Sequence, residues 1–195
     1  TNAKLRVVIQ NAKGVNMPKD RIDAAIKRAA DKDTSSYEEV IYEGYAPHGV
    51  AVLVETSTDN INRTVASVRS YFTKGGGSLG TTGMLNFVFE RKAVFRINAE
   101  GLSVEDLELE LIDFGAEEVE QDENEILITT AFEDFGNMQK ALEEKGVHII
   151  SSGFERFPLS YMKVNAEQEA EIQKMLDKME EDDDVNMVYH NMIVE

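Results

Sequence analysis

Cysteine is absent from the 195 residues of the chain. Without thiols the protein can form no disulfide bond, no thiolate nucleophile and no cysteine-ligated metal site. The three histidines stand far apart and include no H-E-x-x-H pattern, which also excludes a histidine metal site. No apolar run approaches the roughly 20 residues that a membrane-spanning helix requires. We therefore expect a cytoplasmic protein with no metal, no cofactor and no membrane partner.

Positive charge is in short supply overall, but it is unevenly placed. The formal net charge is −17, and residues 100–145 carry a net −14, with sixteen Asp and Glu against two Lys. Residues 1–32 and residues 60–99 each carry a net +5. An evenly acidic surface would repel the phosphates of nucleic acid. The distribution indicates a molecule with one anion-attracting and one anion-repelling side, although acidic faces also serve simply to keep a protein soluble.

The hydrophobic pattern at the start of the chain has the period of helices. Residues 2–13 form one amphipathic stretch, and Gly14 follows as a helix-ending residue. A second helix is predicted to begin with Asn16 as its N-cap and Pro18 in its first turn, where the missing N–H does no harm. Because Thr1 already lies in a helical pattern, we expect further residues to precede it in the full protein.

From Tyr37 onward, strand and helix patterns alternate. The elements predicted before residue 100 are strands at 40–45 and 50–55, a helix from Thr58 or Asp59 to about Lys74, and one or two strands within 85–97. The elements predicted after it are a helix at 102–114, a hairpin of 117–121 with 125–130, a helix at 133–145, a strand at 148–157, a helix at 166–179 and a strand at 184–193.

These elements predict an α+β protein with an N-terminal helical segment and two α/β domains of ferredoxin-like type, the second inserted in the first. The αββαβ pattern between residues 100 and 158 is self-contained, and the helix and strand after it can complete the earlier sheet. The predicted boundaries are 1–35 for the helical domain, 36–99 with 159–195 for the split α/β domain, and 100–158 for the inserted acidic α/β domain.

A glycine-rich loop spans residues 75–83. Gly75, Gly77 and Gly80 match G-x-G-x-x-G, but here the motif leaves a helix and enters a strand, the reverse of a dinucleotide-binding motif. No nucleophile–base pair accompanies it, so we expect no catalytic activity. The loop is either a mobile turn with free backbone N–H groups or a flexible finger that presses its backbone against RNA or protein. Five glycines in nine residues favour the finger.

A polar cluster stands at the predicted start of the helix that ends near Lys74. Asn60, Asn62 and Arg63 fall in its first turn, where free N–H groups and the positive end of the helix dipole meet amide donors and a guanidinium. Such a group suits a phosphate. Helix capping beside an ordinary surface arginine explains the same residues equally well.

Several short motifs together resemble the YebC/PmpR family, and the resemblance runs from the first residue to the last. They are Asn16-Met17-Pro18-Lys19-Asp20, Tyr42-Glu43-Gly44-Tyr45, Gly49-Val50-Ala51, Thr58-Asp59-Asn60, Asn62-Arg63-Thr64, Lys74-Gly75-Gly76-Gly77, Leu79-Gly80 and Val188-Tyr189-His190-Asn191. The resemblance implies three domains with the boundaries given above, and a Lys-rich stretch ahead of the first helix.

The resemblance also implies a non-enzymatic regulator of gene expression. The family is known for DNA-binding transcriptional regulators, and its mitochondrial translational activator of cytochrome c oxidase points to the ribosome and its RNA as the alternative partner. A protein-binding scaffold would use the acidic domain instead. The residues predicted to contact nucleic acid are Asn60, Asn62, Arg63, Arg69, Lys74, Gly75, Gly76 and Gly77, with Lys4, Arg6, Lys13, Lys19, Lys27 and Arg28 of the N-terminal helices.

Overall fold

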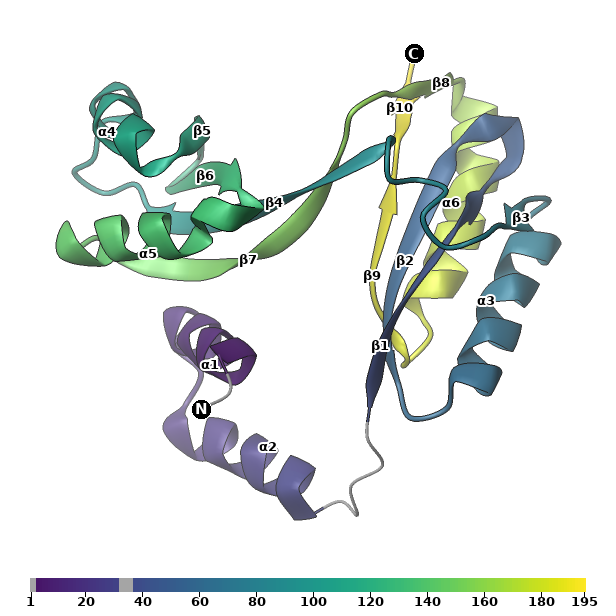
Figure 1. Ribbon diagram of the computed structural model, residues 1–195, viewed down its shortest axis with the longest axis horizontal. Coiled ribbons are helices and arrows are strands. Elements are labelled where there is room, and N and C mark those ends of the chain that lie inside the picture. The colour runs from purple at the N-terminus through teal and green to yellow at the C-terminus, as the bar shows by residue number, and fades with distance from the viewer. Residues whose placement is uncertain (1–2, 32–36) are drawn as a thin grey trace. The chain divides into compact units, whose positions relative to one another are not determined.

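The computed structural model describes residues 3–31 and 37–195 (Figure 1). The chain divides into two compact units, which we call unit 1 (Thr1–Asp33 with Arg91–Glu155) and unit 2 (Thr34–Glu90 with Arg156–Glu195). Each unit combines helices with antiparallel strands, which confirms the predicted α+β class. No helix within the described residues is long and apolar enough to cross a lipid bilayer.

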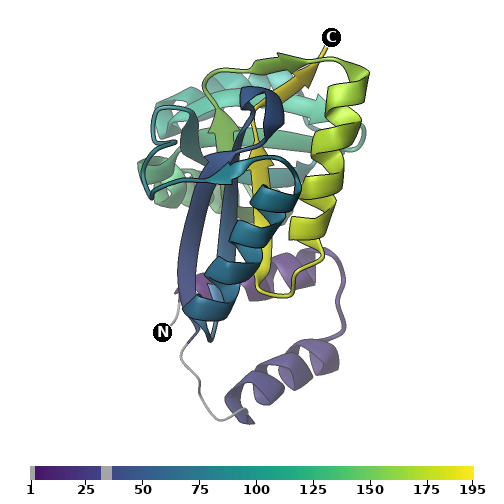
Figure 2. The ribbon, with the colours of Figure 1, turned by 90° about the vertical axis from the view of Figure 1, so that its right-hand side faces the viewer.

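Unit 2 is built on a four-stranded sheet in the order β3-β1-β2-β9. Two helices, α3 and α6, pack side by side on one face of this sheet (Figure 2), where Val52, Phe72 and Leu176 belong to one buried cluster. Strand β9, near the end of the chain, returns to pair antiparallel with β2. The elements of the unit are β1 (Glu38–Tyr45), β2 (Ala51–Thr58), α3 (Ile61–Lys74), β3 (Ser78–Leu79), α6 (Ala166–Glu180), β9 (Val185–His190) and the parallel pair β8 (Met162–Val164) and β10 (Met192–Val194).

Unit 1 contains a second four-stranded sheet, in the order β5-β6-β4-β7. The element order β4-α4-β5-β6-α5-β7 is compatible with a ferredoxin-like unit. Phe95, Leu111 and Ile128 lie in its buried cluster. The elements are β4 (Phe89–Asn98), α4 (Val104–Leu111), β5 (Ala116–Asp122), β6 (Glu125–Ala131), α5 (Phe135–Glu144) and β7 (Ile149–Pro158).

The strand predicted within residues 85–97 lies in a different sheet from the one expected. The prediction placed it in the split domain of residues 36–99, whereas β4 pairs along residues 92–98 with β6. Ala93, Phe95 and Ile97 alternate along β4 and are fully buried in the core of unit 1. The reason is the burial of this alternating face, because in the sheet with β6 the three side chains pack in one core with Leu107 of α4 and Leu142 of α5.

The N-terminal helices, α1 (Ala3–Gly14) and α2 (Lys19–Asp31), are joined by a tight turn. Asn16 was predicted to cap α2, but it ends α1 instead. Its φ is 56°, its N–H donates to Lys13, and the N–H of Met17 donates to Ala12. This is a helix-ending pattern in which a left-handed residue satisfies the last carbonyls, and Asn tolerates that conformation better than most residues.

Within unit 1, α1 lies against β7. The side chain of Asn11 donates to the carbonyl of Ser152 and accepts from its N–H, each at 2.9 Å. Gly14 sits so close to the backbone of Ile150 that a Cβ there would lie 2.0 Å from its oxygen. One face of α1 is therefore committed to the strand, and the opposite face is left for solvent or a partner.

Candidate nucleic-acid interface

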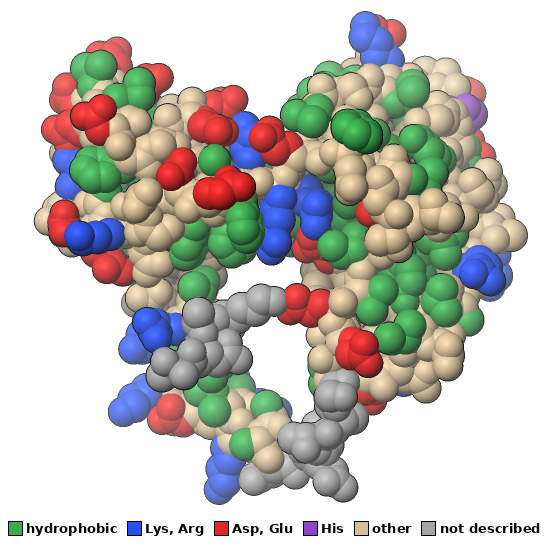
Figure 3. Space-filling model, in the orientation of Figure 1, with side chains coloured by type: hydrophobic (Ala, Val, Ile, Leu, Met, Phe, Trp, Pro, Cys, Tyr) green, Lys and Arg blue, Asp and Glu red, His purple; other side chains and the backbone are tan. Residues whose placement is uncertain are grey.

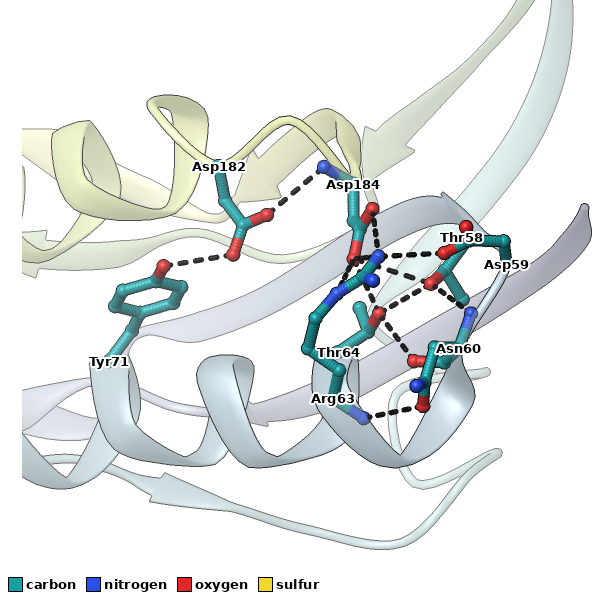
Figure 4. Close-up of polar contacts among 8 residues, drawn as sticks. All are labelled: Thr58, Asp59, Asn60, Arg63, Thr64, Tyr71, Asp182 and Asp184. Atoms are coloured by element: carbon teal, nitrogen blue, oxygen red, sulfur yellow. Dashed lines mark hydrogen bonds and ion pairs between the residues drawn. The ribbon is translucent and has the colours of Figure 1, made fainter. Parts of the chain in front are cut away.

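The polar cluster at the start of α3 is occupied by the chain's own carboxylates (Figure 4). The Arg63 guanidinium lies 2.8 Å from an oxygen of Asp184 and 2.9 Å from one of Asp59. The hydroxyl of Thr64 donates to Asp184 at 2.7 Å. Asp184 lies immediately before β9. The negative charge that this helix start was predicted to attract is therefore supplied by a carboxylate of unit 2 itself.

Asn60, rather than Thr58 or Asp59, is the N-cap of α3. Its side chain accepts from the N–H of Arg63 at 3.1 Å. The hydroxyl of Thr58 instead accepts from the N–H of Asn60, and Asp59 turns outward to Arg63. Helix capping explains the presence of Asn60, and the ion pairs with Asp184 and Asp59 explain that of Arg63. Asn62 is exposed on the first turn.

The electrostatics of the cluster favour the charged forms of Asp184 and Arg63. Hydrogen bonds from Arg63 and Thr64 hold the pKa of Asp184 below its ordinary value, and the bonds to Asp184 and Asp59 raise the pKa of Arg63. The Arg63 side chain remains about half exposed, at 51%. A phosphate could reach this guanidinium only in competition with two carboxylates, so Arg63 is a weaker candidate for nucleic-acid binding than the sequence indicates.

Replacing Asp184 by Asn should lower the stability of unit 2 at neutral pH by about 1–2 kcal/mol, because a charge-assisted pair is lost. Folding lowers the pKa of Asp184, so its contribution is present above the pKa of the unfolded chain and is lost as the pH falls through the folded value. The difference between wild type and D184N should therefore begin to shrink below about pH 4, the ordinary pKa of an aspartate, and disappear only once the pH falls below the lowered pKa of the folded state. Thermal melts between pH 7 and pH 3 measure it, with D183N at an exposed neighbour as the control.

The glycine turn after α3 is tightly bonded rather than open. The N–H groups of Gly75, Gly76 and Gly77 donate to the carbonyls of Tyr71, Thr73 and Phe72. Gly76 has a φ of +76°, which ends the helix in the left-handed conformation. The expectation of a mobile turn with free N–H groups is wrong for these three residues, because the last carbonyls of α3 accept them.

Close packing explains the other glycines of this turn. A Cβ on Gly77 would lie 2.3 Å from the carbonyl oxygen of Tyr45, and one on Gly75 would lie 2.5 Å from the sulfur of Met175. Gly77 is therefore restricted to glycine by the backbone beside it, whereas a side chain at Gly75 would require Met175 to move. The richness in glycine reflects packing within unit 2 more directly than mobility.

A buried carboxylate holds the rest of the loop, and sequence reasoning missed it. Glu43 is only 5% exposed, and its two oxygens accept from the N–H groups of Gly83 at 3.0 Å and Leu85 at 2.7 Å. The N–H of Gly80 donates to the Glu43 carbonyl. The available signal was a charged residue inside the otherwise uncharged stretch of residues 40–45. Beyond this anchor, Phe87 stands 91% exposed.

Lys74 and Arg69 are exposed on α3, and neither forms an ion pair with the residues that the structure describes. Lys74 borders a hollow of about 450 Å³ between α3 and α6. The hollow mixes charges, because its lining residues are Tyr71, Lys74, Gly75, Gly76, Glu171, Lys174, Met175 and Lys178. One of these lysines, Lys178, pairs with Glu181. Lys74 and Lys174 leave the hollow with a net positive charge, because Glu171 is the one carboxylate among these lining residues.

The N-terminal helices carry cations with no carboxylate partner among residues 3–31 and 37–195. Arg6 and Lys13 are seven residues apart on α1, and Arg21 and Arg28 are seven apart on α2, so each pair shares one helix face. All four side chains are exposed. Sequence reasoning overlooked Arg21, although its spacing from Arg28 was the signal. Lys19 and Lys27 are exposed on other faces of α2, and the side chain of Lys4 lies outside the described residues.

The cation pair on α1 faces away from β7. Taking about 100° per residue, Arg6 and Lys13 lie about 140° and 160° around the helix from Asn11, which is bonded to Ser152. The surface over α4 and β5, in contrast, is crowded with Asp and Glu (Figure 3). Unit 1 thus contains both the free cations of its helices and the densest carboxylates of its sheet domain.

Comparison with known proteins identifies the family. The family model described as the second and third domain of TACO1/YebC matches residues 37–192. This chain belongs to the TACO1/YebC family. The two N-terminal helices lie ahead of the matched range, so the cations of α1 and α2 are outside the two domains that define the TACO1/YebC match.

Relatives along nearly the whole chain support the TACO1/YebC assignment. A protein of Cytophaga hutchinsonii is 60% identical over 192 residues, covering 98% of this chain and 81% of the relative. Proteins of Flavobacterium psychrophilum and Myxococcus xanthus are 55% and 49% identical, again over 98% of this chain and 81% and 82% of theirs. All three bear the name "Probable transcriptional regulatory protein".

A crystal structure supports the fold of this TACO1/YebC chain. A conserved hypothetical protein of Aquifex aeolicus matches with a TM-score of 0.82 at 40% identity, covering all of this chain and 81% of that one. This likeness shows that the two chains share a fold.

Proposed function

We propose that this protein regulates gene expression without catalysis, as a cytoplasmic DNA-binding transcriptional regulator of the TACO1/YebC family. The observation that carries the proposal is the set of four exposed cations on α1 and α2, Arg6, Lys13, Arg21 and Arg28, none of which has a carboxylate partner among the described residues. The names of the relatives agree with a regulatory role.

The spacing of these cations suits a phosphate backbone. Seven residues of α-helix rise about 10.5 Å and complete almost two turns, so each pair presents two positive charges along one line. Arginine and lysine at such spacing contact phosphates without reading bases, and phosphate contacts supply position and affinity. The inserted domain is the most acidic part of the chain, so the duplex would meet the protein through the helical domain of residues 1–35 while the inserted domain repels it.

One observation favours structured RNA, and hence a ribosome-associated translation factor, as the second candidate. The described cations without a carboxylate partner form small groups on α1, α2 and α3 of an acidic protein, which gives few contacts along a regular duplex. Structured RNA is recognised through shape and phosphates at a limited number of points. The same four residues would bind in both cases, so the choice depends on the nucleic acid.

The two candidates are separated by competition. The chain is titrated into a fluorescent duplex DNA at about 50 mM salt, and the complex is challenged with unlabelled duplex or with a ribosomal RNA fragment of equal phosphate count. Preferential displacement by duplex DNA supports the transcriptional regulator. Preferential displacement by the RNA supports the ribosome-associated translation factor. Failure of the chain to bind either nucleic acid would overturn the proposal as a whole.

A further inference from the structure

Helix α4 carries apolar side chains on the face that points away from its own core. Leu107 and Leu111 are buried in unit 1, whereas Leu109 is 74% exposed and Ile112, at the end of the helix, is 61% exposed. Leu109 lies about 160° around the helix from both buried leucines. Phe114, 41% exposed, continues the apolar surface in the turn that follows. This outward face does nothing for the packing of unit 1.

Carboxylates surround the apolar side chains. Glu105, Glu108 and Asp113 are exposed beside Leu109 and Ile112 on the same short stretch. None of the three forms an ion pair with any residue in the described ranges 3–31 and 37–195, whereas Glu110, on another side of α4, is paired with Lys145. Figure 3 shows hydrophobic side chains among acidic ones over α4. We call the face made by Glu105, Glu108, Leu109, Ile112 and Asp113 the α4 face.

The charge of the α4 face decides between possible occupants. Nucleic acid is excluded because its phosphates would meet three unpaired carboxylates. A second copy docking through the same face would bring like charges together, which is destabilising. A cationic, partly apolar segment gains affinity by burying the apolar side chains of the α4 face. Its positive charge also orients it against the carboxylates and speeds the encounter.

We propose that the α4 face docks a basic, amphipathic segment of a protein partner. The apolar side of the segment covers Leu109 and Ile112, and its Lys or Arg side chains reach the surrounding carboxylates. This interaction is independent of the nucleic-acid contacts on α1 and α2, because it uses none of the four cations there. It gives the acidic domain a role as a recruitment surface, with the partner identified by its charge and helical periodicity.

The test uses the whole chain and a synthetic amphipathic peptide of about 14 residues, made of leucine and lysine at helical spacing. Binding is measured by calorimetry, and the site is mapped by amide shifts in the NMR spectrum. The L109S/I112S variant should bind the peptide at least about tenfold more weakly, because it loses the burial of two aliphatic side chains. Both residues are exposed, so the variant should fold normally, which the same spectra check.

Two controls separate the α4 face from general acidity. The variant E118Q/E120Q removes two exposed carboxylates from β5 and should change the affinity by less than about twofold. A peptide of the same composition in scrambled order should bind much more weakly than the amphipathic one. Equal binding by wild type and L109S/I112S, or equal binding of both peptides, would reduce the interaction to charge alone and overturn the proposal. Self-association of the wild type that L109S/I112S abolishes would also overturn it, in favour of a second copy.

Discussion

Replacing Glu43 by Ala should destabilise unit 2 by about 3 kcal/mol, because two backbone N–H groups would be left without their acceptor in a buried site. The Glu43 carboxylate accepts from both Gly83 and Leu85. Leu85 is itself 1% exposed and packs in a cluster with Leu53 and Phe89. Loss of the anchor should therefore loosen the loop and part of the core beneath it. A loss of this size corresponds to roughly 10 °C in the melting temperature.

The matched control is Glu38 on the same strand, which is exposed, so E38A should change stability by less than about 0.5 kcal/mol. The E43Q variant keeps one acceptor oxygen and should fall between E43A and the wild type. Thermal unfolding gives the stabilities, and hydrogen exchange at the amides of Gly83 and Leu85 reports the loop directly. If E43A has the same melting temperature as E38A, the Glu43 carboxylate does not hold the loop.

Replacing Arg6, Lys13, Arg21 and Arg28 together by Ala should abolish most nucleic-acid binding. Each phosphate contact contributes about 0.9 to the slope of log affinity against log salt for duplex DNA, so the slope should fall by between three and four. At about 50 mM salt the affinity should fall by a factor of 100 or more. The side chains are exposed, and their removal should leave the melting temperature nearly unchanged.

The control for this variant removes four other cations and so makes the same change in formal net charge. Lys140, Lys145, Lys163 and Lys178 are each paired with a carboxylate. Their replacement by Ala should lower the affinity slightly through net charge but leave the slope largely intact. A control variant that loses as much slope as the test variant would show that binding follows total charge and not the two helices.

The sequence predicted local elements better than their pairing. The helix that begins at Ala166 and the hairpin around residues 122–125 are found where periodicity and turn residues indicate. The strand that became β4 was also predicted, but its sheet was not, because strand pairing depends on which distant strand buries its apolar face. Asn16 shows the same limit at shorter range, since an Asn between two helices can cap either one.

The candidate site illustrates a second limit. Arg63 looks available in the sequence because its partner Asp184 stands 121 residues away. The glycines after α3 look mobile because the atoms that crowd them, in Tyr45 and Met175, come from other elements. A sequence reveals which residues carry charge or lack side chains, but only the tertiary contacts reveal which of those charges are already neutralised. The exposed pairs on α1 and α2 were partly predictable because helical spacing is a local property.

The most direct test of the nucleic-acid proposal is the salt dependence of binding measured for the wild type, R21A/R28A and R63A on one duplex DNA. We predict that R21A/R28A loses about two units of slope while R63A loses almost none, because the Arg63 guanidinium is already held by Asp184 and Asp59. The opposite result, with a slope lowered by R63A and unchanged in R21A/R28A, would contradict the account. It would return the nucleic-acid interface to the start of α3.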